Sequence, residues 1–81
     1  MSRTADRNII ELNLAHVAAL AREAGKLLDR CSEVLTTIRD AAEEGTEFKD
    51  AMVSADLDAR STCFALEDML DSIAKARRVH A

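Results

Sequence analysis

The segment 38–52, IRDAAEEGTEFKDAM, decides the fold, because a long helical pattern breaks and restarts there. Gly45 can take the left-handed backbone conformation that ends helices. Thr46 can cap a following helix, whose first turn then carries an acidic residue. Ile38 and Met52 lie at equal distances on either side of Gly45 and would face each other if the chain reversed. The segment therefore predicts the turn of a helical hairpin.

On both sides of this turn, apolar and small residues recur at alternating spacings of four and three. Such spacing keeps side chains on one helix face and is typical of coiled coils. The stripe before the turn comprises residues 10, 14, 17, 21, 24, 28, 31, 35, 38 and 42, and the stripe after it residues 48, 52, 55, 59, 62, 66, 69, 73 and 76. Pairing positions equidistant from Gly45 mostly sets a bulky residue against Ala or Thr, which keeps two helices evenly separated. We expect an all-α fold, an antiparallel two-helix hairpin with coiled-coil-like packing.

The 81 residues are expected to form a single helical-hairpin domain, 1–81. We place the first helix at about 6–43, the turn at 44–46 and the second helix at about 47–79. Asp6 or Asn8 can cap the first helix. The second helix has an alternative, because Ser54 followed by acidic residues resembles another helix start. A local irregularity near 51–55, or a separate helical turn at 47–53, would then replace the continuous helix.

The two flanks of the paired stripes differ in polarity. One flank is mostly apolar, whereas the other is small or polar and includes Gly25, where a neighbouring helix could approach closely. A two-helix hairpin cannot cover so wide an apolar surface alone, so we expect a homodimer in the form of a four-helix bundle. Each large side chain buried there would contribute ~1.5–3 kcal/mol. The predicted dimer interface consists of Leu20, Leu27, Val34, Cys63 and Leu70.

Another apolar group lies outside the stripes, on the outward side of the second helix. Val53, Leu57 and Phe64 follow one another at helical spacing, with Arg60 among them. Aromatic residues and arginines commonly anchor protein–protein contacts. We interpret these four residues as a binding site for another protein. A third packing element or a higher oligomer could also cover them.

Residues that could carry chemistry do not converge. His16 and His80 have no second ligand three or four positions away, and no Ser or Cys nucleophile lies beside a base. Cys31 and Cys63 are expected to stay reduced, because a disulfide between them would need distortion. The acids at 56 and 58 are interpreted as part of a solvated face. We therefore expect no enzyme, no catalytic residue, no metal site, no cofactor and no small-molecule substrate.

Charge and hydropathy restrict the partners further. The net charge is −4, from 11 Lys and Arg against 15 Asp and Glu, which argues against a general nucleic-acid binder. No apolar run approaches the ~18 residues that span a bilayer, and no signal-peptide pattern opens the chain. We expect a cytoplasmic protein with no membrane contact. A hairpin would nevertheless bring five basic residues to one end: Arg3, Arg7, Lys75, Arg77 and Arg78.

These features predict a small, non-enzymatic protein–protein interaction module, a homodimeric regulatory or accessory protein that acts as an inhibitor, adaptor or chaperone. One alternative is a purely structural oligomerisation bundle. Another is a weak nucleic-acid or anionic-surface binder that uses the basic chain ends. A heptad hairpin occurs in many unrelated proteins, so the pattern itself names no pathway.

Overall fold

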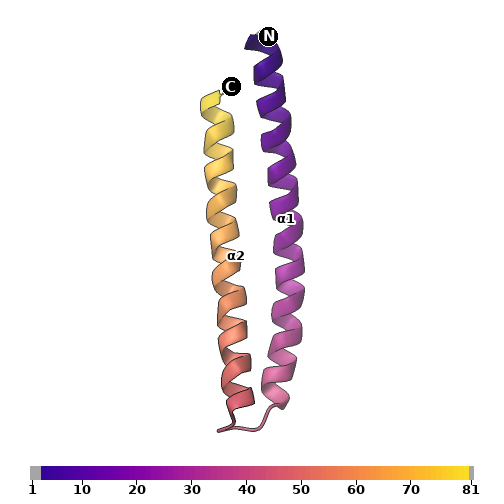
Figure 1. Cartoon of the computed structure of the whole chain (residues 1–81), viewed down its shortest axis with the longest axis vertical. Helices are drawn as coiled ribbons and strands as arrows, with labels where there is room; N and C mark the ends of the chain where they lie inside the picture. Colours follow the sequence, from indigo (N-terminus) through magenta and orange to yellow (C-terminus); the bar gives the residue numbers. More distant parts are fainter. Residues whose placement is uncertain (1–2, 81) are drawn as a thin grey trace.

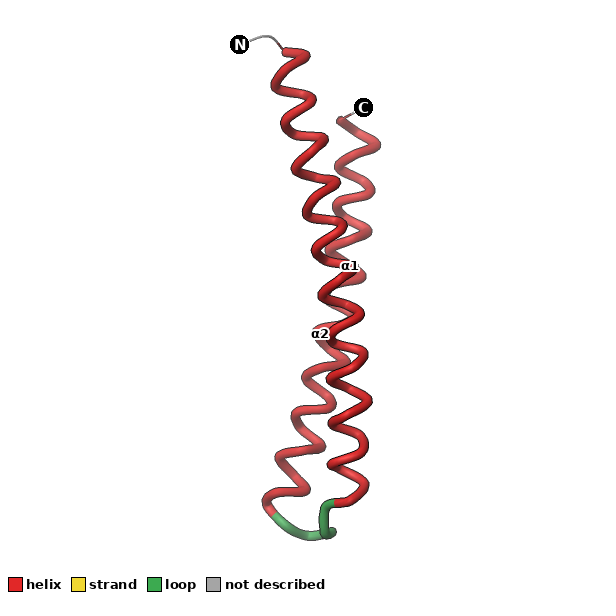
Figure 2. Tube along the Cα trace, turned by 90° about the vertical axis from the view of Figure 1, so that its right-hand side faces the viewer, coloured by secondary structure: helices red, strands yellow, loops and turns green. Residues whose placement is uncertain are grey.

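The computed structural model describes the backbone of residues 3–80 and the side chains of residues 6–80. Two α-helices, α1 (Arg3–Ala41) and α2 (Glu47–His80), run antiparallel and bring both chain ends to the same end of the molecule (Figure 1). The molecule is a rod of 62 × 16 × 16 Å. Figure 2, turned by 90°, shows the helices crossing at mid-length, as in a coiled coil. The predicted all-α hairpin is confirmed.

The turn forms as its residues predict. Gly45 has a positive φ of 78°, which a residue with a side chain rarely adopts. Thr46 Oγ1 accepts a hydrogen bond from the Lys49 backbone N–H at 3.1 Å, which caps α2. The same hydroxyl donates to the Glu43 carbonyl at 2.7 Å and so ties the loop to the cap. The loop is longer than predicted, because α1 ends at Ala41 rather than near residue 43.

The helix boundaries contradict the expected cap of α1 and confirm the expected continuity of α2. The first helix begins at Arg3, so Asp6 and Asn8 lie inside it and do not cap it. The second helix is continuous from Glu47 to His80, which excludes the irregularity near 51–55 and the separate turn at 47–53. The acid at position 56, which resembled part of a helix start, instead binds side chains of α1, and Ser54 is exposed.

The contact line between the helices, called the seam below, has small and polar residues at its most buried positions and partly covered leucines, Met52 and Ile73 beside them. Ala18 is 2% exposed, Ala21 4%, Ala59 8% and Asp56 1%. Partly covered residues continue this line at spacings of three and four. They are residues 11, 14, 25, 28, 32, 35 and 39 on α1 and residues 49, 52, 63, 66, 70, 73 and 77 on α2. Small side chains let two helices approach closely, which explains why this line faces inward.

The predicted stripe lies only half on the seam. Its positions 14, 21, 28 and 35 on α1 are covered, whereas Ile10, Val17, Cys31 and Ile38 are exposed. Helix α1 is therefore rotated from the predicted orientation, so that its small and polar flank faces α2. Helix α2 instead turns the flank that contains Asp56, Cys63 and Leu70 towards α1. Gly25 lies in the seam but no close approach occurs there, since a Cβ atom added at this residue would meet nothing within 4 Å. That expectation is wrong because the helices leave an open groove beside Gly25, towards Leu66 and Leu70.

Asp56 links the two helices near the turn. Its Oδ2 atom accepts a 2.6 Å charged hydrogen bond from Arg39 Nη1 of α1 and lies 3.1 Å from Arg60 Nη2 of α2. Its Oδ1 atom accepts a hydrogen bond from Ser32 Oγ at 3.1 Å. The interpretation of this acid as part of a solvated face is therefore wrong. A buried carboxylate must be paired, and only one alignment of the helices provides its partners.

Polar contacts also hold both ends of the rod. At the turn, Lys49 Nζ donates to the Arg39 carbonyl at 2.5 Å and pairs with Glu44 at 3.2 Å. At the open end, Arg77 binds Glu11 Oε1 through Nε at 2.9 Å and Nη2 at 2.6 Å. These hydrogen bonds and ion pairs form only in one relative position of the helices, whereas contacts between alanines would allow one helix to shift along the other. The polar contacts therefore fix the register of the hairpin.

Replacing Asp56 by Asn should lower the free energy of unfolding by about 2–4 kcal/mol. The neutral amide would leave the partly buried Arg39 without its counter-charge. Solvent contact of the guanidinium limits the loss of stability. Arg60→Gln is the control and should cost under about 1 kcal/mol, because Arg60 is mostly exposed. Urea unfolding followed by circular dichroism at one protein concentration measures both. Equal urea midpoints for the two variants would contradict this role of Asp56.

Candidate interaction surfaces

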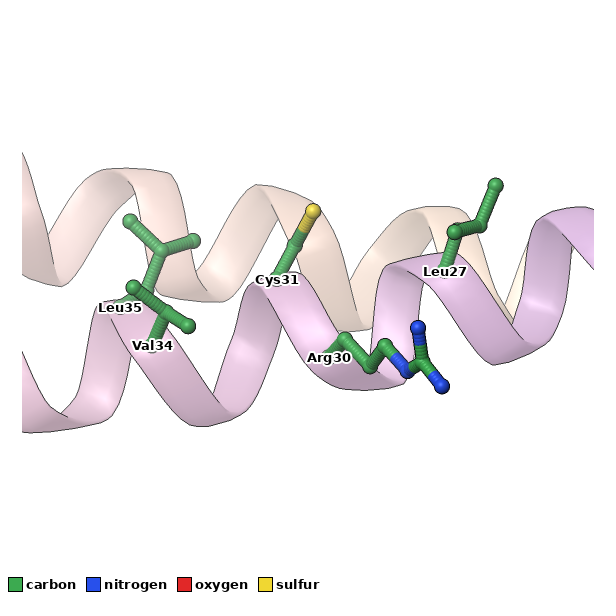
Figure 3. A pocket seen from close by; sticks show the side chains of 5 residues that line it. All are labelled: Leu27, Arg30, Cys31, Val34 and Leu35. Atoms are coloured by element: carbon green, nitrogen blue, oxygen red, sulfur yellow. The ribbon is translucent and has the colours of Figure 1, made fainter.

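Large apolar side chains of α1 are exposed along one side of the seam. Leu20, Leu27 and Val34 are each more than half exposed, and Cys31 is exposed between them. Figure 3 shows Leu27, Cys31 and Leu35 projecting from α1 on the same side, whereas Arg30 projects on the other. With Val34, these residues line a shallow depression that is almost entirely apolar. Sequence spacing places three further exposed apolar residues of α1 on the same side: Ile10, Val17 and Ile38.

The same side of α2 adds to this surface. Every second seam residue is directly preceded in the sequence by a residue that lies on one side of the seam. Because the helices are antiparallel, these preceding residues of α1 and α2 lie on the same side of the hairpin. On α2 these positions carry Phe48 and Met69, both exposed. We call the combined surface the apolar face. It comprises Ile10, Val17, Leu20, Leu27, Cys31, Val34, Ile38, Phe48 and Met69.

The structure places three of the five predicted dimer-interface residues on the apolar face. Leu20, Leu27 and Val34 are exposed there, as the sequence analysis expected. Cys63 and Leu70 are instead half-buried in the seam, where they border the groove beside Gly25. The difference follows from the rotation of α2, which turns the side that carries Cys63 and Leu70 towards α1.

The four predicted partner-binding residues form a separate surface, called the outer patch. Val53, Leu57 and Phe64 are exposed on α2. Arg60 stands among them with its guanidinium fixed by Asp56. Spacing places this patch beyond the opposite side of the seam, so the apolar face and the outer patch do not overlap. The patch is a short apolar ridge with one arginine held in place.

A groove with apolar and charged walls lies between the two helices on the side of the outer patch. Its walls include Arg22, Lys26 and Asp29 of α1 and Cys63 and Glu67 of α2. Cys63 Sγ lies 3.9 Å from Asp29 Oδ1 and donates a weak hydrogen bond to it. Partial burial raises the pKa of the Cys63 thiol above its usual value, and the negative charge of Asp29, this hydrogen bond and Glu67 raise it further. Cys63 is therefore a poor nucleophile at neutral pH.

The basic chain ends are partly engaged within the hairpin. Arg77 is paired with Glu11, and His80 Nε2 lies 3.4 Å from the Arg7 carbonyl. Lys75 and Arg78 are exposed, whereas the side chain of Arg3 lies outside the described residues. The structure thus brings these ends together, as expected for a hairpin, with one of the arginines already neutralised.

Metal-ligand clusters, membrane-spanning helices and disulfides are absent from the part of the chain that the structure describes. Among residues 3–80, no three His, Cys, Asp or Glu side chains gather as a metal site would require. Neither α1 nor α2, over their described lengths, is long and apolar enough to cross a membrane. Cys31 and Cys63 are both free. No family model matches the chain, and no curated protein or solved structure is detectably similar to it.

Sequence reasoning missed the polar group around Asp56. A usable signal was present, since Ser32 and Arg39 recur seven residues apart on α1 and Asp56 falls at a compatible position of α2. Polar residues of two helices that can meet across their contact predict a buried network rather than a solvated face.

Replacing Asp29 by Asn should lower the pKa of the Cys63 thiol and speed its alkylation. The substitution removes the negative charge that opposes thiolate formation and weakens the acceptor of the S–H hydrogen bond. Rates of iodoacetamide modification between pH 7 and pH 10, measured by mass spectrometry in a Cys31→Ala background, give the thiol pKa. Glu23→Gln is a control that changes the net charge by the same amount. Glu23 pairs with Lys26 and is not among the groups that raise the Cys63 pKa, so this variant should leave the pH profile unchanged. An unchanged pH profile in Asp29→Asn would contradict this assignment.

Proposed function

We propose that the protein is a non-enzymatic protein–protein interaction module that works as a homodimer. In this proposal the apolar face of one hairpin packs against that of a second copy and completes a four-helix bundle. The outer patch then binds another protein, as expected of a regulatory or accessory component. The observation that carries the proposal is the apolar face, which the seam leaves uncovered over most of the length of α1.

The composition of the seam supports the need for a second copy. A chain of 81 residues is near the lower limit for a self-sufficient core, and its most buried side chains are three alanines and one aspartate. These four side chains remove little apolar surface from water, and the larger apolar residues of the seam are only partly buried. Burial of the apolar face would supply the missing contribution.

The size of the apolar face supports dimerisation energetically. Each copy exposes six large aliphatic residues of α1 on this face, and burial contributes ~1.5–3 kcal/mol for a side chain of this kind. Even partial burial in two copies exceeds the lower estimates of the cost of association, about 4–15 kcal/mol. The six residues are Ile10, Val17, Leu20, Leu27, Val34 and Ile38.

The position of the outer patch supports a second role. The patch stays accessible when the apolar face is covered, because the two surfaces lie on different sides of the seam. Phe64 and Leu57 can act as anchors, and the pairing of Arg60 with Asp56 lowers the entropy that this arginine would lose on binding. A dimer would present two copies of the patch, which suits an adaptor or an inhibitor.

Replacing Leu27 by Glu should convert the dimer to a monomer at micromolar concentration. The change puts two charges into the apolar face of the bundle, whereas leucine and glutamate have similar helix propensities. Leu57→Glu is a matched control, because Leu57 is 57% exposed and Leu27 55% exposed. Sedimentation equilibrium measures the mass of each variant.

The control should remain dimeric. Wild-type protein that sediments as a monomer, or a Leu27→Glu variant that dimerises as tightly as wild type, would overturn the proposal for the apolar face. Dissociation by Leu57→Glu alone would assign dimerisation to the outer patch instead.

A further inference from the structure

We propose that the second copy lies antiparallel on the apolar face, with α1 packed against the α1 helix of the partner subunit. The twofold axis then passes close to Gly25 and Lys26. This inference rests on the proposed function, since it takes a second copy as the occupant of the face. It adds the direction, the register and the residue pairs of the contact.

The residues on the two flanks of the apolar face of α1 decide whether the α1 helix of the partner subunit runs parallel or antiparallel. One flank is apolar and consists of the half-buried seam residues Leu14, Leu28 and Leu35 together with Ala21. The other flank is polar and consists of His16, Glu23, Arg30 and Thr37, all exposed. In an antiparallel helix pair each flank meets its own counterpart, whereas in a parallel pair unlike flanks meet.

Antiparallel packing therefore joins apolar with apolar and polar with polar. The leucine flanks of both subunits would meet at the centre of the bundle, beside the seam. A parallel pair would instead place Glu23 and Arg30 against the leucine flank of the partner subunit and desolvate those charges. This difference favours the antiparallel direction.

Side-chain sizes set the register. When the axis passes close to Gly25 and Lys26, small residues meet large ones across the contact, which fills space evenly. The facing pairs would be Ala24 with Leu27 of the partner subunit, Leu20 with the partner's Cys31, Val17 with the partner's Val34, and Ile10 with the partner's Ala41. Asn13, opposite the partner's Ile38, is the polar exception and lies towards the end of the contact.

Charge complementarity supports the same register. Glu23 would lie beside the partner's Arg30, and symmetry makes this pair twice. Glu23 makes only a 3.9 Å contact with Lys26 in its own helix, and Arg30 has no ion pair among the residues whose side chains are described. Both charges are therefore available at the surface to pair across the axis.

Disulfide cross-linking tests the arrangement. The variant Leu20→Cys with Cys63→Ala keeps Cys31 and should form a covalent dimer when oxidised with copper phenanthroline. Residues 20 and 31 of one chain lie about 16 Å apart along the helix, so they cannot bond within a subunit. Two controls should not cross-link, Cys63→Ala alone and Leu20→Cys with Cys31→Ala and Cys63→Ala. In the proposed register their identical cysteines lie about 16 Å apart along the bundle axis.

The outcomes separate the two proposals. A cross-link between the Cys31 thiols of the first control would indicate a parallel pair and overturn the antiparallel arrangement, with the dimer intact. A dimer by sedimentation equilibrium that forms no cross-link in any variant would overturn the contact between the two α1 helices. A monomer for all variants and for wild type would overturn the homodimer itself.

Charge reversal gives an independent readout. Glu23→Arg should raise the dissociation constant of the dimer roughly 2- to 30-fold, because two cross-subunit pairs become repulsive. Adding Arg30→Glu should restore wild-type affinity, since the pairs re-form with exchanged charges. Equal weakening by the single and double variants would contradict the proposed pairing.

Discussion

The most buried positions between the two helices carry small and polar residues, and the other features of the molecule depend on this constraint. Alanines bring α1 and α2 close together, and Asp56 binds both Arg39 and Arg60 at the point of contact. Such a contact aligns helices well but removes little apolar surface from water. Six large aliphatic residues of α1 lie to one side of the seam, where the hairpin itself does not cover them.

Local rules were enough to predict the hairpin. Gly45 and Thr46 act through the backbone of their own turn, and the spacing of apolar residues requires two long helices, so these features depend on no tertiary information. The inward face of each helix was not predicted correctly. Large apolar residues such as Val17 and Ile38 fit the centre of a four-helix bundle, whereas small residues fit the contact between two closely packed helices. The spacing of apolar residues does not distinguish these two contacts.

The same distinction explains which surface residues could be identified. Leu20, Leu27 and Val34 were found because they are too many for one hairpin to bury, and exposure on α1 follows directly. Cys63 and Leu70 were misplaced because their position depends on the rotation of α2. Asp56 was missed because a charged residue is usually solvated. Only its distances to Arg39 and Ser32 reveal that it is buried and paired.

The concentration dependence of thermal unfolding tests the central claim, that a hairpin whose most buried residues are small or polar depends on a second copy for its stability. Circular dichroism from low micromolar to millimolar protein gives the Tm at each concentration. The account predicts that Tm rises steadily with concentration, because association stabilises only the folded state. A cooperative transition with the same Tm across this range would contradict it.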